Sequence, residues 1–573
     1  MKYDDVLKIL GEFGKFQKIQ CLLVCIVTFT LSLHSMNMVF VGPTPGHWCK
    51  PAANSTPTNL SELGFDLYPR KPDGSQDSCH IYNPGTNTEN DTHSTFDWSP
   101  SNETKIYCQN GWTYSQEFYT NTIVSEWDLV CKDAWKRSTA SSIFFAGRLT
   151  GALVAGQLSD IIGRRPVFFV CSLLLAVVGT AAAWSPNVEV FYFLYFLQGC
   201  LQVSVSLTSF VLGVELLGTG KRTFYVIVNK VSDCLGQVAL TPIAYFIRDW
   251  RWIEFSISII FLGYIAYFWL LPESVRWLMS KGKEKEAKSI LQRAAKVNKV
   301  KLTDEVLDSI QFEDAKKSKY TVLDLFRTWK FAKITLMLWY LWMANAMVYY
   351  GLTINTSDMG VNPYINYFLS CTSEIPALAI AMCLIDKVGR RKMLFTFTCI
   401  GALGCFTTAF IPAHLKWLSM AVSILGKFGV SGSYMMMYLM GAEIFPTVVR
   451  NVGIGTSSVW ARIGGIIAPA LIFFGNYYKP LPMLCFGAIM TIAAGLGLLL
   501  PEYTGKRLAQ TFDDMEEQDV EQNKEVTKEI LNHNSESNIE NNMENKEEFE
   551  KSLLSDGQKQ PNGKIDADEE CAA

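Results

Sequence analysis

The sequence predicts an all-α membrane protein built from two six-helix halves. Two observations carry this prediction. About twelve long apolar runs divide the 573 residues, and short motifs of the first half return in the same order in the second. Backbone groups in lipid must be hydrogen-bonded internally, so runs of this length form membrane-spanning helices. Motifs that return at one offset indicate a tandem duplication of a membrane unit.

The expected spans and their connections divide the chain into five parts. The runs lie at 19–41, 138–157, 167–184, 188–213, 223–246, 252–271, 333–353, 364–385, 393–411, 416–441, 451–474 and 481–500. They place the first half at 19–271 and the second at 333–502. A cytosolic helical loop at 272–332 is expected to tether the two halves. Residues 1–18 read as a short cytosolic N-terminal helix, and 503–573, rich in Asn, Glu and Lys, as a disordered cytosolic tail.

Two motifs at span ends recur in the second half. A basic turn, GQLSDIIGRRP, begins at Gly156 and returns as DKVGRRK at Asp386, and ELLGTGKR at 215–222 returns as EIFPTVVR at 443–450. The offsets are 226 (386 − 160) and 228 (443 − 215) residues. We expect the acids and arginines of both motifs to form interhelical ion pairs that close the cytosolic side when the cavity is open outward. The repeated residues are Asp160, Gly163, Arg164 and Arg165 with Asp386, Gly389, Arg390 and Arg391, and Glu215 and Arg222 with Glu443 and Arg450. A third echo, with no role assigned, sets Pro272-Glu273 against Pro501-Glu502.

The polar loop at 42–137 indicates which side of the membrane faces outward. It holds four cysteines and four Asn-X-Ser/Thr sequons, which together are typical of an extracellular, oxidising compartment. The short GRR turns are basic and therefore belong in the cytosol, and twelve spans then place both termini there. We expect two disulfides, for which three connectivities are possible, and glycan on the sequons. These residues are Cys49, Cys79, Cys108 and Cys131, and Asn54, Asn59, Asn90 and Asn102.

Several function classes find no support in the sequence. GTGKR at 218–222 is not a phosphate loop, because Glu215 stands where a glycine is needed and Arg222 replaces the Ser/Thr. No metal cluster, nucleophile triad or basic patch with interleaved aromatic residues stands out. We therefore expect neither catalysis, nor ATP-driven transport, nor nucleic-acid binding, and no cofactor. Sodium coupling stays open, because no sodium motif is readable.

Several stretches carry a family resemblance that runs nearly end to end. GQLSDIIGRRP resembles the loop signature of the major facilitator superfamily. TIVSEWDLVC (122–131), AYFIRDWRW (244–252) and EIFPTVVRNVG (443–453) resemble the solute carrier 22 family of organic cation, anion and carnitine transporters, and the carnitine and zwitterion branch is nearest. The resemblance implies the major facilitator fold and alternating access in the plasma membrane. Tyr195 stands where many superfamily members have an arginine, which argues against proton coupling through that position, and Val275 replaces a usual proline.

Four ionisable residues are expected near the middle of the membrane, where a charge is costly and therefore a functional hypothesis. Arg148 and Glu374 each lie twelve residues before the aspartate of their GRR motif. Arg462 and Asp233 lie twelve and eleven residues after the arginine of the second motif. At 1.5 Å per residue, twelve residues correspond to about 18 Å of helix. The duplication thus predicts two cations and two anions at one depth, although structural ion pairs between helices remain the alternative.

In the family fold, helix 2 abuts helix 11 and helix 5 abuts helix 8. This would place Arg148 beside Arg462 and Asp233 beside Glu374, so that a central cavity has a positive and a negative pole. Lys230 either pairs with Asp233 at i,i+3 and mutes it, or points elsewhere.

The resemblance also assigns binding roles. Anion and carnitine members carry an arginine at the position of Arg462, and Glu374 matches a pocket acid of cation members. Tyr349 and Phe210 match aromatic pocket positions, which suit a quaternary ammonium near a fixed anion.

The predicted function is alternating-access transport of a small organic solute, most of all a carnitine-like zwitterion or an organic cation. An organic anion exchanger is favoured instead if Lys230 neutralises Asp233, and an organic cation uniporter if Arg462 pairs internally. A non-transporting receptor or scaffold is the alternative of another class. The sequence does not indicate the oligomeric state.

Overall fold

The computed structural model describes residues 3–50, 68–70, 76–82, 105–303, 306–307, 321–412 and 414–502. All contacts reported below lie within one compact unit, Met1–Phe445 with Val449–Lys506. The second unit comprises Pro446–Val448 and Arg507–Ala573. The predicted tail at 503–573 and the four sequons of the polar loop lie outside the described residues.

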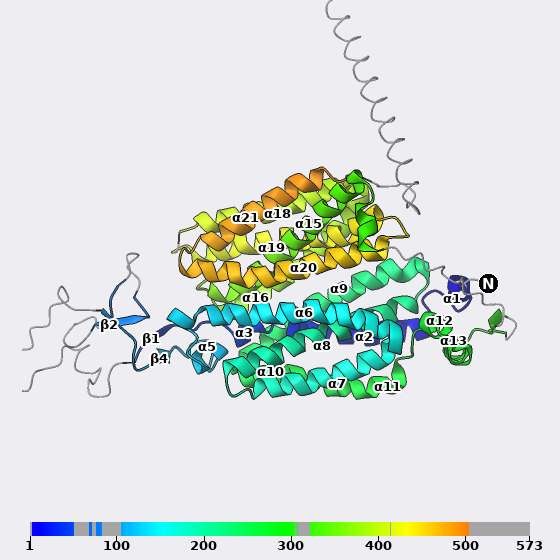
Figure 1. The fold of residues 1–573 in the computed structure, drawn as a ribbon, viewed down its shortest axis with the longest axis horizontal. Coiled ribbons are helices and arrows are strands. Elements are labelled where there is room, and N and C mark those ends of the chain that lie inside the picture. The colour runs from blue at the N-terminus through cyan, green and yellow to red at the C-terminus, as the bar shows by residue number, and fades with distance from the viewer. Residues whose placement is uncertain are drawn as a thin grey trace, which may run out of the picture. The chain divides into compact units, whose positions relative to one another are not determined.

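The first half consists of six spans, and each coincides with one expected apolar run (Figure 1). They are α2 (Lys15–Ser35), which continues as α3 (Met38–Val41), α6 (Trp135–Ile162), α7 (Arg164–Ala183), α8 (Val188–Glu215), α9 (Arg222–Ile247), and α10 (Trp250–Ile259), which continues through the 3-10 helix η3 (Ile260–Ala266) to α11 (Tyr267–Leu270).

The second half repeats this arrangement in the described residues. After the 3-10 helix η4 (Val322–Phe326) come α15 (Trp329–Ile354), η5 (Asn355–Asp358), α16 (Pro363–Thr372) with α17 (Glu374–Val388), α18 (Arg390–Phe410), α19 (Lys416–Ile444), α20 (Arg450–Phe473), η6 (Phe474–Asn476) and α21 (Leu481–Leu498). The break between α16 and α17 falls just before Pro376, which has no backbone N–H to donate in a continuous helix.

Nine of these helical segments in the described part of the chain are long and apolar enough to cross a membrane by composition alone. The three spans that fall below this level are α6, α9 and α19. Between their ends they carry Arg148, Lys230 with Asp233, and Lys427. The three least apolar spans are thus among those that carry ionisable side chains into the bundle.

Glycines allow the helices of the first half to approach closely. A Cβ on Gly147 of α6 would collide with the backbone carbonyl of Phe196 of α8, and a Cβ on Gly199 of α8 would collide with that of Phe144. Helices in lipid gain little from burying apolar surface against each other, so such close backbone packing supplies much of their association. The α6–α8 contact therefore forms a rigid part of this half.

The two ends of the bundle carry different layers (Figure 1). We call the end with the turns at Gly163 and Gly389 the GRR end, and the opposite end the disulfide end. At the disulfide end, β1 (His47–Cys49) pairs antiparallel with β4 (Trp112–Tyr114), and β2 (His80–Tyr82) pairs with β3 (Lys105–Tyr107). Two disulfides hold these strand pairs, Cys49–Cys108 and Cys79–Cys131. The predicted cysteines are thus bridged, in one of the three possible connectivities.

A short helix, α5 (Ile123–Glu126), ties the disulfide layer to α10. Glu126 accepts hydrogen bonds from Nε1 of Trp250 (2.7 Å) and Nε of Arg251 (3.0 Å). Burial raises the pKa of Glu126, but the donors from Arg251, Trp250 and Asn121 outweigh burial and hold this pKa below its usual value.

At the GRR end, α1 (Tyr3–Ile9) packs with α12 (Val275–Ser280) and α13 (Glu284–Asn298) around one buried apolar cluster. Asn298 fixes this layer, because its side chain accepts from the Phe16 N–H (2.8 Å) and donates to the Leu10 carbonyl (2.9 Å). We expected the loop at 272–332 to tether the two halves. Its described helices α12 and α13 pack on α1 and the first half, where their apolar faces meet, and the tethering role stays a prediction.

Candidate functional site

Each GRR turn is capped by a glutamate from the end of the same half. Gly163 ends α6 with φ of 119°, a conformation that glycine adopts easily, and a Cβ there would lie 2.5 Å from Oε2 of Glu273. Oε1 of Glu273 accepts from the backbone N–H of Arg164 (3.1 Å) and of Arg165 (3.2 Å). The carboxylate thus satisfies unpaired donors at the start of α7 and complements its dipole. Burial raises the pKa of Glu273, although the backbone N–H donors and Arg164 oppose this.

The second copy repeats the cap. Gly389 has φ of 93°, and Glu502 accepts from the backbone N–H of Arg390 (3.1 Å) and of Arg391 (3.0 Å). The repeat of Pro272-Glu273 at Pro501-Glu502 carried no predicted role. The signal was the repeat itself, because the acid returns at 229 residues (502 − 273), close to the 226 of the GRR turns, and is therefore expected to serve those turns.

The ion pairs of the repeated motifs lie within one half each. Nη2 of Arg164 is 3.1 Å from Asp160 and 3.9 Å from Glu215, and Nε of Arg390 is 3.3 Å from Glu443. The pairs to Glu215 and Glu443 join neighbouring helices, α7 with α8 and α18 with α19. Arg222 and Arg450 begin α9 and α20, and the side chain of Asp386 lies outside the described residues.

The two halves meet through polar contacts at the disulfide end. Nη1 of Arg137 pairs with Asp358 across the halves at 2.9 Å, and the Tyr364 hydroxyl donates to the Phe118 carbonyl at 2.6 Å. The Tyr364 ring also stacks on Phe40 at 5.5 Å. Because the motif ion pairs at the GRR end stay within their halves, the described contacts correspond to a state closed at the disulfide end.

Two arginines of the predicted site lie on neighbouring helices, since α6 packs along α20. Nη1 of Arg148 donates to the Tyr350 hydroxyl (3.3 Å), and Nη1 of Arg462 donates to Ser458 of its own helix, at 2.9 Å to the carbonyl and 2.6 Å to Oγ. The two guanidinium groups are close enough to repel each other. Among the described residues, no carboxylate lies within ion-pair distance of either one. The structure therefore brings the two predicted cations together with no direct carboxylate partner, although Asp233 is near enough to attract Arg148.

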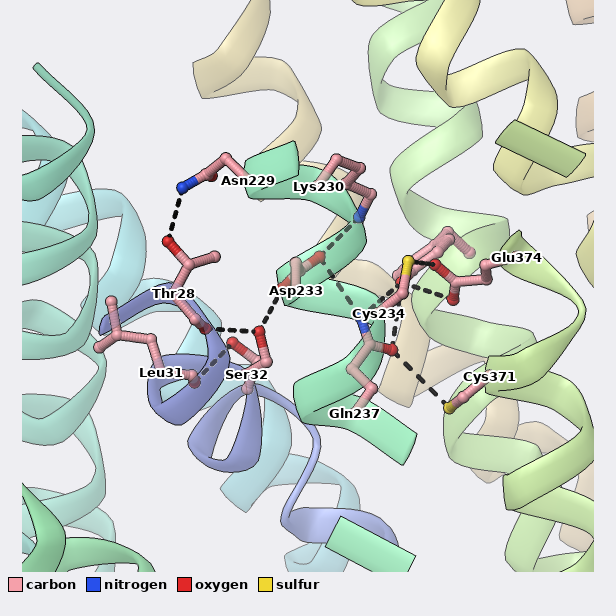
Figure 2. Close-up of polar contacts among 12 residues, drawn as sticks. Thr28, Leu31, Ser32, Asn229, Lys230, Asp233, Cys234, Gln237, Cys371 and Glu374 are labelled. Atoms are coloured by element: carbon pink, nitrogen blue, oxygen red, sulfur yellow. Dashed lines mark hydrogen bonds and ion pairs between the residues drawn. The ribbon is translucent and has the colours of Figure 1, made fainter. Parts of the chain in front are cut away.

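Asp233 is paired in the way that the sequence left open. Its Oδ2 is 2.6 Å from Nζ of Lys230, and the Ser32 hydroxyl of α2 donates to Oδ1 (Figure 2). Gln237 of the same helix approaches Oδ2 at 3.4 Å. The side chains of Lys230 and Asp233 are 31% and 27% exposed. Lys230 thus neutralises the charge of Asp233, but the pair is partly exposed and accessible to water and solutes.

Glu374 lies beside α9, as expected, but is not open to solute. Nζ of Lys427 is 3.2 Å from its Oε1, and both side chains are 1% exposed. The Tyr349 hydroxyl donates to the same oxygen at 2.8 Å, and the thiol of Cys234 lies 3.5 Å from Oε2 (Figure 2 shows Glu374 facing Cys234). Lys427 also lies 3.2 Å from the centre of the Tyr349 ring. The predicted negative pole is therefore a closed, buried ion pair at Glu374.

Aromatic side chains that the sequence reasoning missed surround these charges. Tyr434 of α19 stacks on Tyr349 with ring centres 5.9 Å apart, and Tyr438 contacts Trp342 at 4.4 Å. Tyr438 is 47% exposed. The available signal was the pair of tyrosines at i,i+4 in the sequence YMMMY, which places both rings on one helix face.

Phe210 was predicted to line the same pocket. Its ring lies 5.7 Å from that of Tyr225. Within the described part of the chain, its ring contact is with Tyr225 of the first half and does not connect it to the Tyr349 cluster.

The charges of the site do not cancel. The pairs Lys230–Asp233 and Lys427–Glu374 are each neutral, whereas Arg148 and Arg462 leave two positive charges. An arginine offers parallel donors that match the two oxygens of a carboxylate. The arrangement can therefore hold a carboxylate against the two arginines and an apolar or cationic group against the tyrosines.

Comparisons with known proteins agree with this architecture. The profile of the "Sugar (and other) transporter" family matches residues 83–511. The chain is 35% identical to the "Organic cation transporter protein" of Drosophila melanogaster, over 90% of this chain and 95% of that protein. It is 34% identical to "Organic cation/carnitine transporter 2" of Homo sapiens, over 90% of this chain and 94% of that protein. Mouse "Solute carrier family 22 member 21" is 32% identical over the same share of each chain.

Solved structures resemble the fold. A crystal structure of a D-xylose-proton symporter superposes with a TM-score of 0.54 at 15% identity, and covers 85% of this chain and 99% of that chain. An inward open structure of the xylose transporter XylE from E. coli gives a TM-score of 0.53, also at 15% identity, over 85% of this chain and 97% of that chain. Twelve spans in two halves, repeated GRR turns and these relatives lead to one conclusion. The chain is a multi-pass membrane solute transporter, not an enzyme, and belongs to the major facilitator superfamily and, within it, to the solute carrier 22 family of organic cation and carnitine transporter relatives.

Proposed function

We propose that this chain carries a small organic solute with a carboxylate across the plasma membrane, and that the first candidate is a carnitine-like zwitterion. One observation carries the proposal. Arg148 and Arg462 lie together on α6 and α20, and within the described residues they have no carboxylate partner at ion-pair distance. Two partly buried like charges repel and are costly to desolvate, so a solute carboxylate between them relieves both costs.

The carboxylate would bind Arg462, supported by Arg148 from the neighbouring helix. A charge-assisted hydrogen bond contributes about 1.5–3 kcal/mol, so losing this contact weakens apparent affinity roughly ten- to a hundredfold. A simple cation would leave both arginines unpaired, and Asp233 and Glu374 are each already paired with a lysine. This disfavours an organic cation that lacks a carboxylate.

The ammonium end would lie against the tyrosines of α19 and share Asp233 with Lys230. Tyr438 is 47% exposed and Asp233 27% exposed, whereas Glu374 is nearly inaccessible. A quaternary ammonium is attracted to aromatic faces without needing a hydrogen bond. The relatives named organic cation/carnitine transporters also support a zwitterionic solute.

A second candidate is an organic anion exchanger. The specific observation in its favour is the 2.6 Å ion pair between Lys230 and Asp233, which removes one negative charge from the cavity. The excess positive charge of the two arginines would then be matched by a monoanion or dianion alone.

Transport would proceed by alternating access, with the GRR end and both termini in the cytosol. The Arg164–Glu215 and Arg390–Glu443 pairs would hold each half rigid at its inner end. When the disulfide end opens, the inner acids and arginines would re-pair across the halves and close the cytosolic side.

The test is an uptake panel of carnitine, tetraethylammonium and a dicarboxylate, each with and without sodium. Arg462→Ala should lose at least tenfold in apparent carnitine affinity, and Arg462→Lys should recover little of it, because lysine lacks the planar fork. Lys285→Ala removes an exposed lysine from α13 and serves as the matched control. Preference for the dicarboxylate would select the anion exchanger. Normal carnitine uptake by Arg462→Ala at wild-type surface level would refute the carboxylate site, and no saturable uptake of any probe would favour a receptor or scaffold.

A further inference from the structure

A buried acid lies inside the first half and takes no part in the substrate site described above. Glu254 of α10 is completely buried, as are His34 of α2 and Gln198 of α8. The carboxylate accepts hydrogen bonds from Nδ2 of Asn37 (2.6 Å) and from Nε2 of Gln198. His34 Nδ1 lies 3.7 Å from Oε1 of Glu254. The two amides are neutral, so they supply no permanent positive charge.

The charge state of this cluster follows from its burial. An ionised carboxylate without a cation is very costly in the interior of a membrane span. Glu254 can avoid this cost by carrying a proton itself, or by leaving the proton on His34 and forming an ion pair. In both forms the His34–Glu254 pair holds one proton and is electrically neutral. Loss of that proton would leave a full negative charge at a site with no water contact.

The elements packed around Glu254 offer few other titratable groups. His34 comes from α2, and from α8 comes Tyr195, which reaches the acid only through Asn37. On α10 itself, Arg251 lies one turn away and is already paired with Glu126. From α3, α7 and α9, no charged side chain among the described residues has a hydrogen bond or ion pair with the cluster. The proton of the pair therefore has no competing counter-charge.

A hydrogen-bonded connection leads from Glu254 toward the boundary between the halves. The Tyr195 hydroxyl donates to Oδ1 of Asn37 at 2.8 Å, and Asn37 donates to Glu254. Tyr195 also lines a small cavity of about 10 Å³, which is room for about one water. Ile354 of the second half forms part of the wall of this cavity. Parting of the halves at the disulfide end would remove Ile354 and let water reach Tyr195.

We propose that the His34–Glu254 pair is a proton-binding site, and that a proton is taken up from the disulfide side before this end closes over the substrate. Closure with the site empty would seal an unpaired carboxylate, so the unprotonated transporter remains open. The proton binds without any covalent step. The inference does not depend on which organic solute is carried, because none of these residues belongs to the proposed substrate contacts.

One test follows solute uptake against external pH in proteoliposomes. In the wild type, uptake should fall about tenfold for each unit by which the external pH rises above the range where the site is occupied. Occupancy of a one-proton site falls by the same factor. Glu254→Gln keeps the shape of a protonated carboxyl and should give a flat profile, changing less than about twofold. Glu189→Gln, which neutralises an exposed acid on α8, should behave as the wild type. His34→Gln should shift the profile along the pH axis and keep its slope, because the carboxyl alone then holds the proton.

A second test needs no transported solute and therefore stands even if the proposed substrate is wrong. Infrared difference spectra of the purified protein between acid and alkaline pH should show a band from this pair, either the carbonyl stretch of a protonated carboxyl or the ring mode of an imidazolium, which Glu254→Gln removes and Glu189→Gln leaves in place. A pH profile in Glu254→Gln as steep as that of the wild type would overturn the proposal, as would an infrared difference spectrum that this substitution leaves unchanged. Loss of sodium dependence in place of pH dependence would equally overturn it and assign the site to a metal cation.

Discussion

Breaking the buried ion pair between Lys427 and Glu374 tests whether Glu374 serves the fold or the substrate. The two charges are 3.2 Å apart, and both side chains are 1% exposed. Removing one member of such a pair leaves an uncompensated buried charge, which costs about 3–5 kcal/mol. The loss of stability in Lys427→Met should lie at the upper end of this range, because Glu374 then keeps only neutral donors from Tyr349 and Cys234. Glu374→Gln should lie at the lower end, because Lys427 still contacts the Thr353 hydroxyl and the Tyr349 carbonyl.

The double variant decides the question. Replacing both charges removes the desolvation cost together with the attraction, so it should cost only about 1–2 kcal/mol, less than either single change. The assay is the thermal unfolding midpoint of purified protein, followed by tryptophan fluorescence, combined with carnitine uptake. If the pair is structural, the double variant regains both stability and uptake. Single losses that simply add up in the double variant would refute the coupling. A stable double variant without uptake would return Glu374 to the substrate site.

Four further predictions concern other parts of the molecule. Gly163→Ala should slow transport and lower stability by about 1–3 kcal/mol, because it strains a positive φ and displaces the cap Glu273; unfolding midpoints against wild type measure this. Asp160→Asn should cut the maximal uptake rate at unchanged surface level, and normal turnover would remove Asp160 from the gate. The lowered pKa of Glu126 means that its contacts stabilise at neutral pH and are lost as pH falls through and below its usual value of about 4.3. Unfolding midpoints of wild type and Glu126→Gln should therefore differ at pH 7 and converge in acid. Glycosidase should increase gel mobility through glycan on the loop at 42–137, and an unchanged mobility would weaken the proposed orientation.

The sequence determined the features that depend on position along one helix or on the repeat. A helix rises by a fixed amount per residue, so the spacing from the GRR motifs placed Arg148 and Arg462 at one depth without any tertiary information. The resemblance then put their helices side by side, and α6 does pack along α20. The cap formed by Glu273 could have been anticipated in the same way, because its repeat follows that of the turns.

Only the tertiary structure decided which side chains meet. The depth of Glu374 was predictable, but its partner Lys427 stands on another helix, 53 residues further along the chain (427 − 374), and the pairing depends on how both helices are rotated. His34 and Glu254 show the same limit, since neither belongs to a readable motif and they meet only because α2 and α10 pack on each other. Rotation and partner choice are set jointly by the packing and desolvation of many side chains, whereas span length and depth are set by local backbone geometry. For this reason the sequence alone predicted which charges lie midway along the spans, and only the folded structure showed which of them are already neutralised.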